Sequence, residues 1–176
     1  ATAVESLGGK IFENSAAIRV ERGATPLIVT AKGSVKAKFV VVAGNAYLNN
    51  IIPELQAKSM PCGTQVLTTE PLSDDLANSL LPQDHCVEDC NYLLDYFRLS
   101  ADKRLIYGGG VVYGGRDPLD VEAIIRPKML TTFPQLKGVK IDFAWTGNFL
   151  LTLSRLPQMG RIGGNIYYSQ GCSGHG

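Results

Sequence analysis

Residues 160–176 read GRIGGNIYYSQGCSGHG and carry the strongest indication of fold in this sequence. Asn165 to Ser169 favours a β-strand, and this strand runs directly into a glycine cluster. Because glycine adopts positive φ and lacks a side chain, such a cluster lets the backbone pass close to a ligand. Free N–H groups after a strand can hold a flat or anionic ligand, although glycine clusters also form plain turns. The chain stops where a following helix would begin, so we expect a piece of a larger protein.

The segment from Phe39 to Gly44 is an unbroken apolar run, which is typical of a strand in a parallel sheet covered on both faces. It ends at Ala43-Gly44-Asn45. In doubly wound sheets, ligands bind beyond the carboxyl ends of the strands; an ordinary buried strand followed by a turn is the alternative. The glycine fingerprint Gly-x-Gly-x-x-Gly of dinucleotide-binding proteins is absent from this sequence.

The middle of the chain predicts an antiparallel meander with helices, because short β-prone segments alternate with turn residues. Residues 100–103 and the glycines at 108–110 are the expected turns. The expected strands are 61–72, 92–99, 104–107, 111–113 and 138–145. We expect one helix over 74–80, capped by Ser73, and another over 120–133 with a kink or break at Pro127.

The first sixty residues give weaker signals. Helices are expected at 4–10, ending at the glycines 8 and 9, and at 48–58. Residues 14–20 suggest irregular structure. The expected strands are 10–13, 26–30 and 35–37.

Composition is that of a globular chain, with 45% hydrophobic and 19% charged residues. A net charge of +1 suggests neither a nucleic acid nor an anionic membrane as partner. Four scattered cysteines fit a reducing compartment better than a disulfide framework, so we expect a cytoplasmic protein. His85, Cys86 and Cys90 lack the ligand number and spacing of a zinc site, and we expect no metal.

Three motifs together resemble one family. They are NIYYSQGCSGHG, preceded by WTGNFLLTLSRLPQMGRI, then the hairpin DYFRLSADKRLIYGG and the strand end VVVAGNAY. They are similar to segments of the FAD-dependent amine and amino-acid oxidases of the D-amino-acid oxidase/glycine oxidase superfamily, and the resemblance covers nearly the whole chain.

The resemblance implies an α+β fold, with a mainly antiparallel sheet that forms the substrate domain and part of an FAD-binding α/β domain. Residues 1–53 would be a remnant of the FAD-binding domain, 54–140 the substrate domain, and 141–176 a return to the FAD-binding domain. The missing glycine fingerprint would lie upstream of Ala1.

The resemblance also implies cofactor-binding positions. The turn that would line the flavin comprises Gly171, Cys172, Ser173, Gly174 and His175, although His175 fits a surface loop equally well. Ala43 and Gly44 would lie beside the FAD diphosphate, and the backbone near Ala17 beside the adenine.

Four residues are candidates for the substrate site. Tyr96 and Arg98 lie on a strand that could face the substrate cavity, although an exposed strand pair is the alternative. Trp145 fits a core aromatic slightly better than a wall of the substrate site. Phe149 stands at about the position where glycine oxidase relatives have an arginine for the substrate's α-carboxylate. Because phenylalanine offers no donor, it favours an amine on an aliphatic chain.

The implied reaction is oxidation of a primary aliphatic amine to an aldehyde, with release of ammonia and hydrogen peroxide. The alternatives are an FAD-dependent oxidase of α-amino acids such as glycine, sarcosine or D-amino acids, and a binding domain without catalytic activity. No Ser-His-Asp, Cys-His or paired-carboxylate arrangement identifies catalytic residues, and flavin chemistry does not require one. We expect the fragment alone to bind FAD poorly and to self-associate through exposed apolar faces.

Overall fold

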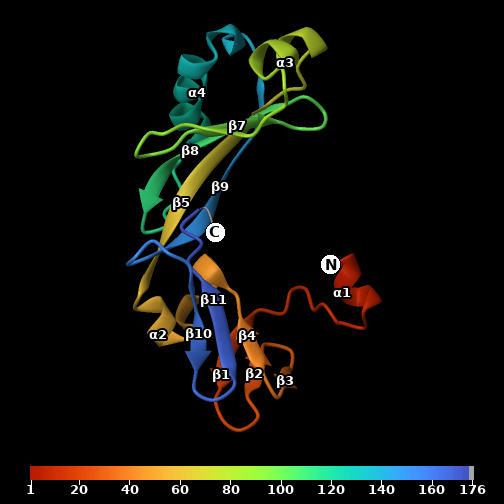
Figure 1. The fold of residues 1–176 in the computed structure, drawn as a ribbon, viewed down its shortest axis with the longest axis vertical. Coiled ribbons are helices and arrows are strands. Elements are labelled where there is room, and N and C mark those ends of the chain that lie inside the picture. Colours follow the sequence, from red (N-terminus) through yellow and green to blue (C-terminus); the bar gives the residue numbers. More distant parts are fainter. Residues whose placement is uncertain (175–176) are drawn as a thin grey trace. The chain divides into compact units, whose positions relative to one another are not determined.

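The computed structural model describes residues 1–174, which form two compact units (Figure 1). Unit 1 contains Ala1–Ser59 and the chain from Thr152 onward, and unit 2 is Met60–Leu151. Sequence reasoning put the second boundary at 140/141. The observed boundary lies at the other end of strand β9 (Ile141–Thr152), because this strand is continuous and belongs to the large sheet of unit 2.

Unit 1 contains two three-stranded sheets, with strand orders β1-β2-β3 and β10-β11-β4. In the second sheet, β10 and β11 form an antiparallel hairpin, and β11 pairs in parallel with β4. The elements of unit 1 are α1 (Thr2–Ser6), β1 (Ala17–Glu21), β2 (Leu27–Thr30), β3 (Ser34–Lys36), β4 (Val40–Val42), η1 (Asn45–Tyr47), η2 (Asn49–Ile51), α2 (Pro53–Gln56), β10 (Gln158–Ile162) and β11 (Ile166–Gln170).

One face of the β10-β11-β4 sheet forms the core of unit 1. Val42 and Ile166 on this face pack against the helical segment that follows β4, from which Leu48, Ile52 and Leu55 are buried. The other face carries exposed apolar side chains, because successive residues of a strand point to opposite sides. We call this the open face of unit 1 and define it by Phe39, Val41 and Tyr167.

Unit 2 is built on a five-stranded sheet with strand order β6-β7-β8-β5-β9. The pairings β6–β7, β7–β8 and β8–β5 are antiparallel. The Glu70 N–H donates to the Lys140 carbonyl and joins the end of β5 to the start of β9. The elements are β5 (Ser59–Thr69), α3 (Asp74–Leu80), β6 (Val87–Glu88), β7 (Tyr96–Leu99), β8 (Leu105–Tyr113), α4 (Val121–Thr132), η3 (Pro134–Leu136) and β9 (Ile141–Thr152).

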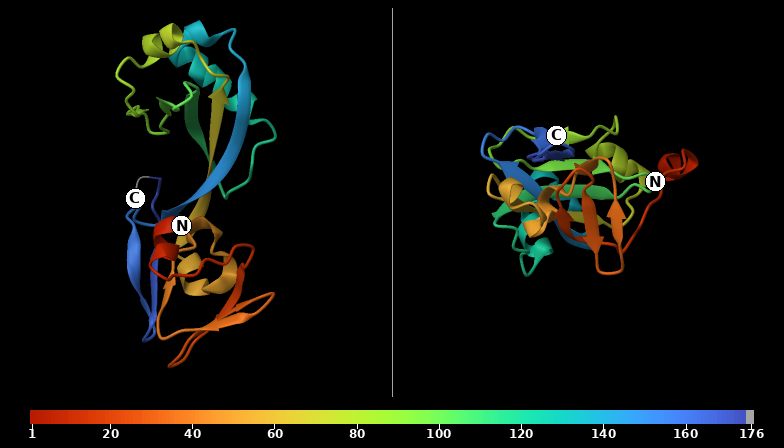
Figure 2. Two further views of the ribbon diagram at one scale, coloured as in Figure 1. Left: turned by 90° about the vertical axis from the view of Figure 1, so that its right-hand side faces the viewer. Right: turned by 90° about the horizontal axis from the view of Figure 1, so that it is seen from below.

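Both α-helices of unit 2 pack on the same face of this sheet (Figure 2). Helix α4 presents Ile125 and Met129, four residues apart and therefore on one helix face, and both are fully buried. They share one core with residues of α3, β5, β7 and β8. The expected α+β class with mainly antiparallel sheets is confirmed.

The glycines at 108–110 do not form the expected turn, and β8 runs through them as one strand. A Cβ at Gly108 would lie 2.1 Å from the ring of Tyr96, and one at Gly109 would lie 2.3 Å from Asp95 Oδ1. Gly110 has φ +72°, at the point where the β5–β8 register shifts. These glycines leave room for neighbouring side chains and form a bulge. From the sequence alone, glycines with this role are not distinguishable from the glycines of a turn.

Several other expectations were wrong. Residues 10–13 form no strand, whereas part of the stretch expected to be irregular forms β1. The expected helix at 48–58 is divided into η2 and α2. Helix α4 does not break at Pro127, whereas a kink there stays a prediction. The pairing of β4 is parallel, but the strand is not covered on both faces, because Val41 is 71% exposed. Trp145 is 45% exposed and is therefore not a core aromatic of unit 2.

Candidate functional site

The carboxyl ends of β4 and β11 meet at one edge of the β10-β11-β4 sheet, because the two strands are parallel neighbours. Val42 lies opposite Tyr168, so the chain leaves β4 through Ala43 and Gly44 beside the place where it leaves β11. This edge brings together six of the eight residues predicted to bind the cofactor, and it is the candidate functional site. These six residues are Ala43, Gly44, Gly171, Cys172, Ser173 and Gly174.

The side chain of Asn45 joins the two loops at this edge. Its Oδ1 accepts a hydrogen bond from the Gly171 N–H at 2.9 Å, and its Nδ2 lies 3.6 Å from Cys172 Sγ as a donor. Asn45 has φ +45°, in the left-handed region that asparagine tolerates better than most residues.

The turn after β11 has a backbone that few residues other than glycine adopt. Gly171, Ser173 and Gly174 have φ of +76°, +50° and +93°. Ser173 Oγ is buried and has no hydrogen-bond partner within the described chain. A buried hydroxyl without a partner is costly, and backbone turns of this kind form concave surfaces for anions. The turn therefore has features that fit a polar or anionic group of a bound ligand.

One predicted cofactor residue is not part of this edge, and another is not described by the structure. Ala17 begins β1, which belongs to the other sheet of unit 1. His175 lies outside the described residues.

Tyr96 and Arg98 lie on the face of the five-stranded sheet opposite the helices. On β7 they alternate with Phe97 and Leu99, which belong to or pack against the core. Tyr96 Oη and Thr64 Oγ1 share a hydrogen bond of 2.9 Å. Arg98 is exposed; its Nε donates to the Leu99 carbonyl at 3.0 Å, and no carboxylate among residues 1–174 forms a salt bridge with it. This face therefore presents a guanidinium group that is able to bind an anion.

Trp145 and Phe149 lie on β9, the edge strand at the other side of the same sheet. Because β5 and β8 separate β9 from β7, unit 2 does not bring them next to Tyr96 and Arg98. Phe149 is half-buried. No residue of β9 within two positions of Phe149 carries a positive charge.

A polar cluster within unit 2 has a structural role. Tyr107 Oη donates to Asp95 Oδ2 at 3.2 Å and shares a hydrogen bond of 2.9 Å with Thr132 Oγ1, and Lys128 Nζ donates to Asp95 Oδ1 at 2.9 Å. Burial raises the pKa of Tyr107 to about 12. All these groups have partners, so the cluster stabilises the packing of α4 against the sheet.

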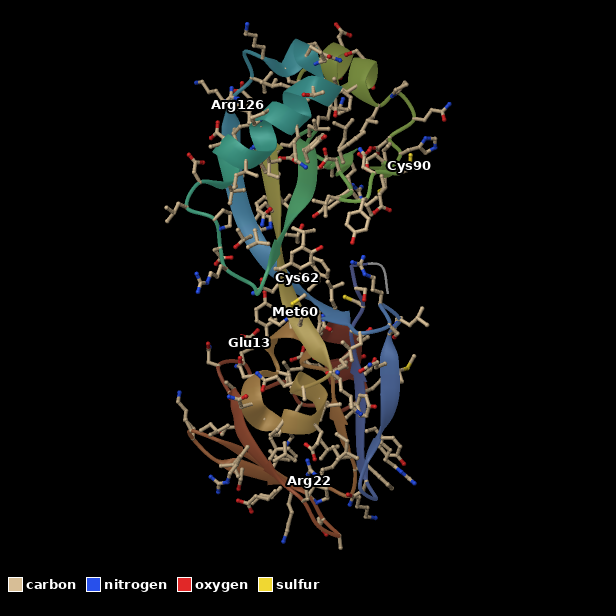
Figure 3. The ribbon with its side chains drawn as sticks, turned by 90° about the vertical axis from the view of Figure 1, so that its left-hand side faces the viewer. Glu13, Arg22, Met60, Cys62, Cys90 and Arg126 are labelled. Carbon is tan, nitrogen blue, oxygen red and sulfur yellow. The ribbon has the colours of Figure 1, made fainter. Side chains whose placement is uncertain are left out.

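No group of three or more histidine, cysteine, aspartate or glutamate side chains among residues 1–174 is arranged to hold a metal ion. The four cysteines are free thiols. Figure 3 shows Cys90 on the loop before β7, away from Cys62 on β5. None of the helices in the described chain is long and apolar enough to cross a membrane.

The sequence of this chain matches a known family of proteins over its whole length. Residues 1–176 match the model of the DAO family, described as FAD dependent oxidoreductase. The chain therefore belongs to the DAO family of FAD dependent oxidoreductases.

Individual relatives agree with this assignment. The chain is 64% identical over 177 residues to gamma-glutamylputrescine oxidoreductase of Escherichia coli (strain K12), with all of this chain and 42% of that protein covered. It is 40% identical over 182 residues to a probable oxidoreductase OrdL of Haemophilus influenzae, with 100% of this chain and 41% of that protein covered. The L-proline dehydrogenase structure from P. horikoshii has a TM-score of 0.80 at 23% identity, with 99% of this chain and 48% of that one covered. The chain thus spans less than half the length of these relatives.

Sequence reasoning missed the two residues that most clearly organise the candidate surfaces, Asn45 and Thr64. An asparagine directly after a strand–glycine junction is a usable signal, because asparagine is common at positive φ and its side chain can bond nearby backbone. The Thr64–Tyr96 hydrogen bond depends on the β5–β8–β7 register, which the sequence does not reveal.

Proposed function

We propose that this chain is part of a longer FAD-dependent oxidase that acts on gamma-glutamylputrescine or a similar aliphatic amine. The overall reaction would be R–CH2–NH2 + O2 + H2O → R–CHO + NH3 + H2O2. The observation that carries the proposal is the 64% identity, over the whole chain, to gamma-glutamylputrescine oxidoreductase of Escherichia coli.

The edge formed by the β4 and β11 loops is the proposed cofactor surface. FAD, when bound, would accept the hydride from the amine carbon. The described residues would bind and orient it: the turn at 172–174, in which Ser173 and Gly174 have positive φ, offers backbone N–H groups, and the buried Ser173 Oγ lacks a partner within the described chain. Ala43 and Gly44 leave the backbone accessible at the end of β4, because both are exposed and have small or no side chains.

Phe149 supports an amine over an α-amino acid as substrate. An α-carboxylate next to phenylalanine would lose hydration without gaining a charged partner. A methylene chain would instead gain about 0.8 kcal/mol for each buried CH2.

The test uses the full-length protein that contains this sequence. Peroxide release is measured with gamma-glutamylputrescine, putrescine, glycine, sarcosine and D-alanine. We expect the two amines to have the higher kcat/KM. An advantage of about tenfold or more for the α-amino acids, about 1.4 kcal/mol of transition-state preference, would replace this proposal by an amino-acid oxidase. A full-length protein without flavin absorbance would indicate a binding domain.

Arg98 is our candidate for binding the substrate carboxylate that lies far from the reacting amine. A guanidinium binds a carboxylate through paired, charge-assisted hydrogen bonds. We expect Arg98→Gln to raise KM for gamma-glutamylputrescine and to leave kcat/KM for putrescine, which has no carboxylate, unchanged. Arg116→Gln, at another exposed arginine of unit 2, is the matched control. Equal losses with both substrates would contradict this role.

We propose the cytoplasm as the compartment in which the protein functions. The four thiols, none of which is paired in a disulfide, support a reducing environment. Fractionation of cells that produce the full-length protein tests this, and recovery in a secreted or membrane fraction would contradict it.

A further inference from the structure

Asn45 lies in the loop after β4, and its side chain bonds to two residues of the loop after β11. It follows β4 by three residues, and its hydrogen-bond partners Gly171 and Cys172 follow β11. The β-ladder itself ends at the pair Val42–Tyr168. Beyond that pair, β11 continues beside β10 as far as Gln170, and the Asn45 amide continues the connection between the loop after β4 and the loop after β11.

The geometry leaves little choice of residue at this position. Asn45 is half-buried and has φ +45°, a conformation that excludes β-branched residues and strains alanine. Glycine would adopt the backbone but would leave the Gly171 N–H, on a buried residue, without its acceptor. Asparagine combines tolerance of positive φ with an acceptor for Gly171 and a donor toward Cys172.

We propose that Asn45 is a positioning residue for FAD binding: it holds the β11 turn at 171–174 in register with the β4 loop at 43–44. This inference rests on the proposed function, since it assumes that FAD binds at this edge. Without the Asn45 side chain, the turn samples other conformations, and the cofactor must select the competent one. The apparent affinity for FAD is then the intrinsic affinity multiplied by the fraction of time that the turn spends in the competent conformation.

Three variants of the full-length protein separate the possible contributions. Asn45→Gly keeps the permitted backbone and removes both side-chain bonds. Asn45→Asp keeps an oxygen acceptor for the Gly171 N–H. Asn49→Gly is the matched control, because Asn49 also has positive φ, at +51°, but is exposed and makes no side-chain hydrogen bond within the described chain.

Two measurements are made on each variant: the Kd for FAD after removal and titration of the cofactor, and amide hydrogen exchange of a peptide covering residues 166–174. For Asn45→Gly we expect the Kd to rise about tenfold, which corresponds to about 1.4 kcal/mol, together with faster exchange. Asn45→Asp should retain the exchange protection, and Asn49→Gly should match the unsubstituted protein in both measurements.

Each other outcome has a distinct meaning. An Asn45→Gly protein that binds FAD within twofold of the unsubstituted protein overturns the proposal, as does equal exchange in Asn45→Asp and Asn45→Gly. An Asn49→Gly protein that behaves like Asn45→Gly shows a general effect of loop glycines and also overturns it. If the unsubstituted full-length protein binds no FAD, the proposed function fails, whereas the exchange data still report whether Asn45 orders the turn.

Discussion

Gly171 meets two separate constraints, since its φ is +76° and a Cβ at this position would lie 2.1 Å from Thr152 Cγ2. Left-handed backbone costs a residue with a side chain roughly 1–2 kcal/mol, and the clash adds to that cost. We expect Gly171→Ala to be clearly less stable than Gly174→Ala in urea denaturation. A built Cβ at Gly174 meets nothing within 4 Å, so Gly174→Ala reports backbone strain alone.

Thr152→Ser supplies the internal control for this comparison. Serine removes the clashing methyl group and can keep the hydrogen bond from Thr152 Oγ1 to the Leu156 carbonyl, which is 2.9 Å long. The double variant Gly171→Ala/Thr152→Ser should therefore regain part of the lost stability. If Gly171→Ala is no less stable than Gly174→Ala, the steric argument is incorrect.

The raised pKa of Tyr107 predicts the direction in which the free energy of unfolding changes with pH. Burial raises its pKa to about 12, whereas the pKa of a tyrosine in the unfolded chain is about 10. The folded state thus favours the neutral phenol, and this contribution to stability is complete below pH ~10 and is lost as the pH rises toward ~12. We expect the free energy of unfolding to fall more steeply over this range in the unsubstituted protein than in Tyr107→Phe.

The same variant reports the hydrogen bonds of Tyr107 at neutral pH. Phenylalanine removes the donor to Asp95 and the bond with Thr132, so Tyr107→Phe should be about 1 kcal/mol less stable at pH 8. Urea titrations at pH 8, 10 and 11 measure both effects. Parallel pH profiles for the two proteins would show that the Tyr107 phenol does not titrate as described.

Helix α4 shows which elements a sequence predicts well. Its apolar residues recur every four positions, and Asp120 is a recognisable cap, so its existence and start were predictable. Strand β8 was not predictable as one continuous strand, because the glycines at 108–110 signal a turn locally. Only the side chains of Tyr96 and Asp95 explain why glycine is needed there. The strands β4 and β11 and the glycine-containing loops after them were predicted from apolar runs and glycines, whereas the pairing of these two strands and the Asn45 bond depend on tertiary structure.

The cap of α4 is testable by itself. Asp120 Oδ1 accepts a hydrogen bond from the Ala123 N–H at 2.9 Å. Asp120→Ala should therefore lower stability by about 1 kcal/mol, measured by urea denaturation. Asp120→Asn retains a capping oxygen and should stay close to the unsubstituted protein. Equal stability of Asp120→Ala and the unsubstituted protein would mean that the cap contributes nothing.

The 176-residue chain as a whole should self-associate in solution. Its open face carries Phe39, Val41 and Tyr167, which are 64%, 71% and 39% exposed, and the first and last of these rings lie 6.3 Å apart. Exposed apolar patches next to an unpaired strand edge promote association. Sedimentation velocity should show species larger than a monomer, and Val41→Lys should reduce them.

A matched substitution away from the open face guards against a general charge effect. Ile124→Lys introduces the same charge at an exposed apolar residue of unit 2, which is 42% exposed. It should leave the association of the chain largely unchanged. A monomeric unsubstituted chain at tens of micromolar would refute the expectation.

The hydrogen bond between Asn45 and Gly171 joins residues 126 positions apart, and this separation has a consequence for folding during synthesis. At roughly 5–20 residues per second, the ribosome needs about 6–25 s to make the intervening chain, so β4 leaves the ribosome long before its partner β11. Closing so large a loop is entropically costly and slow unless unit 2 folds first and shortens it. We therefore expect unit 2 to fold first, while β4 depends on chaperones until β11 emerges.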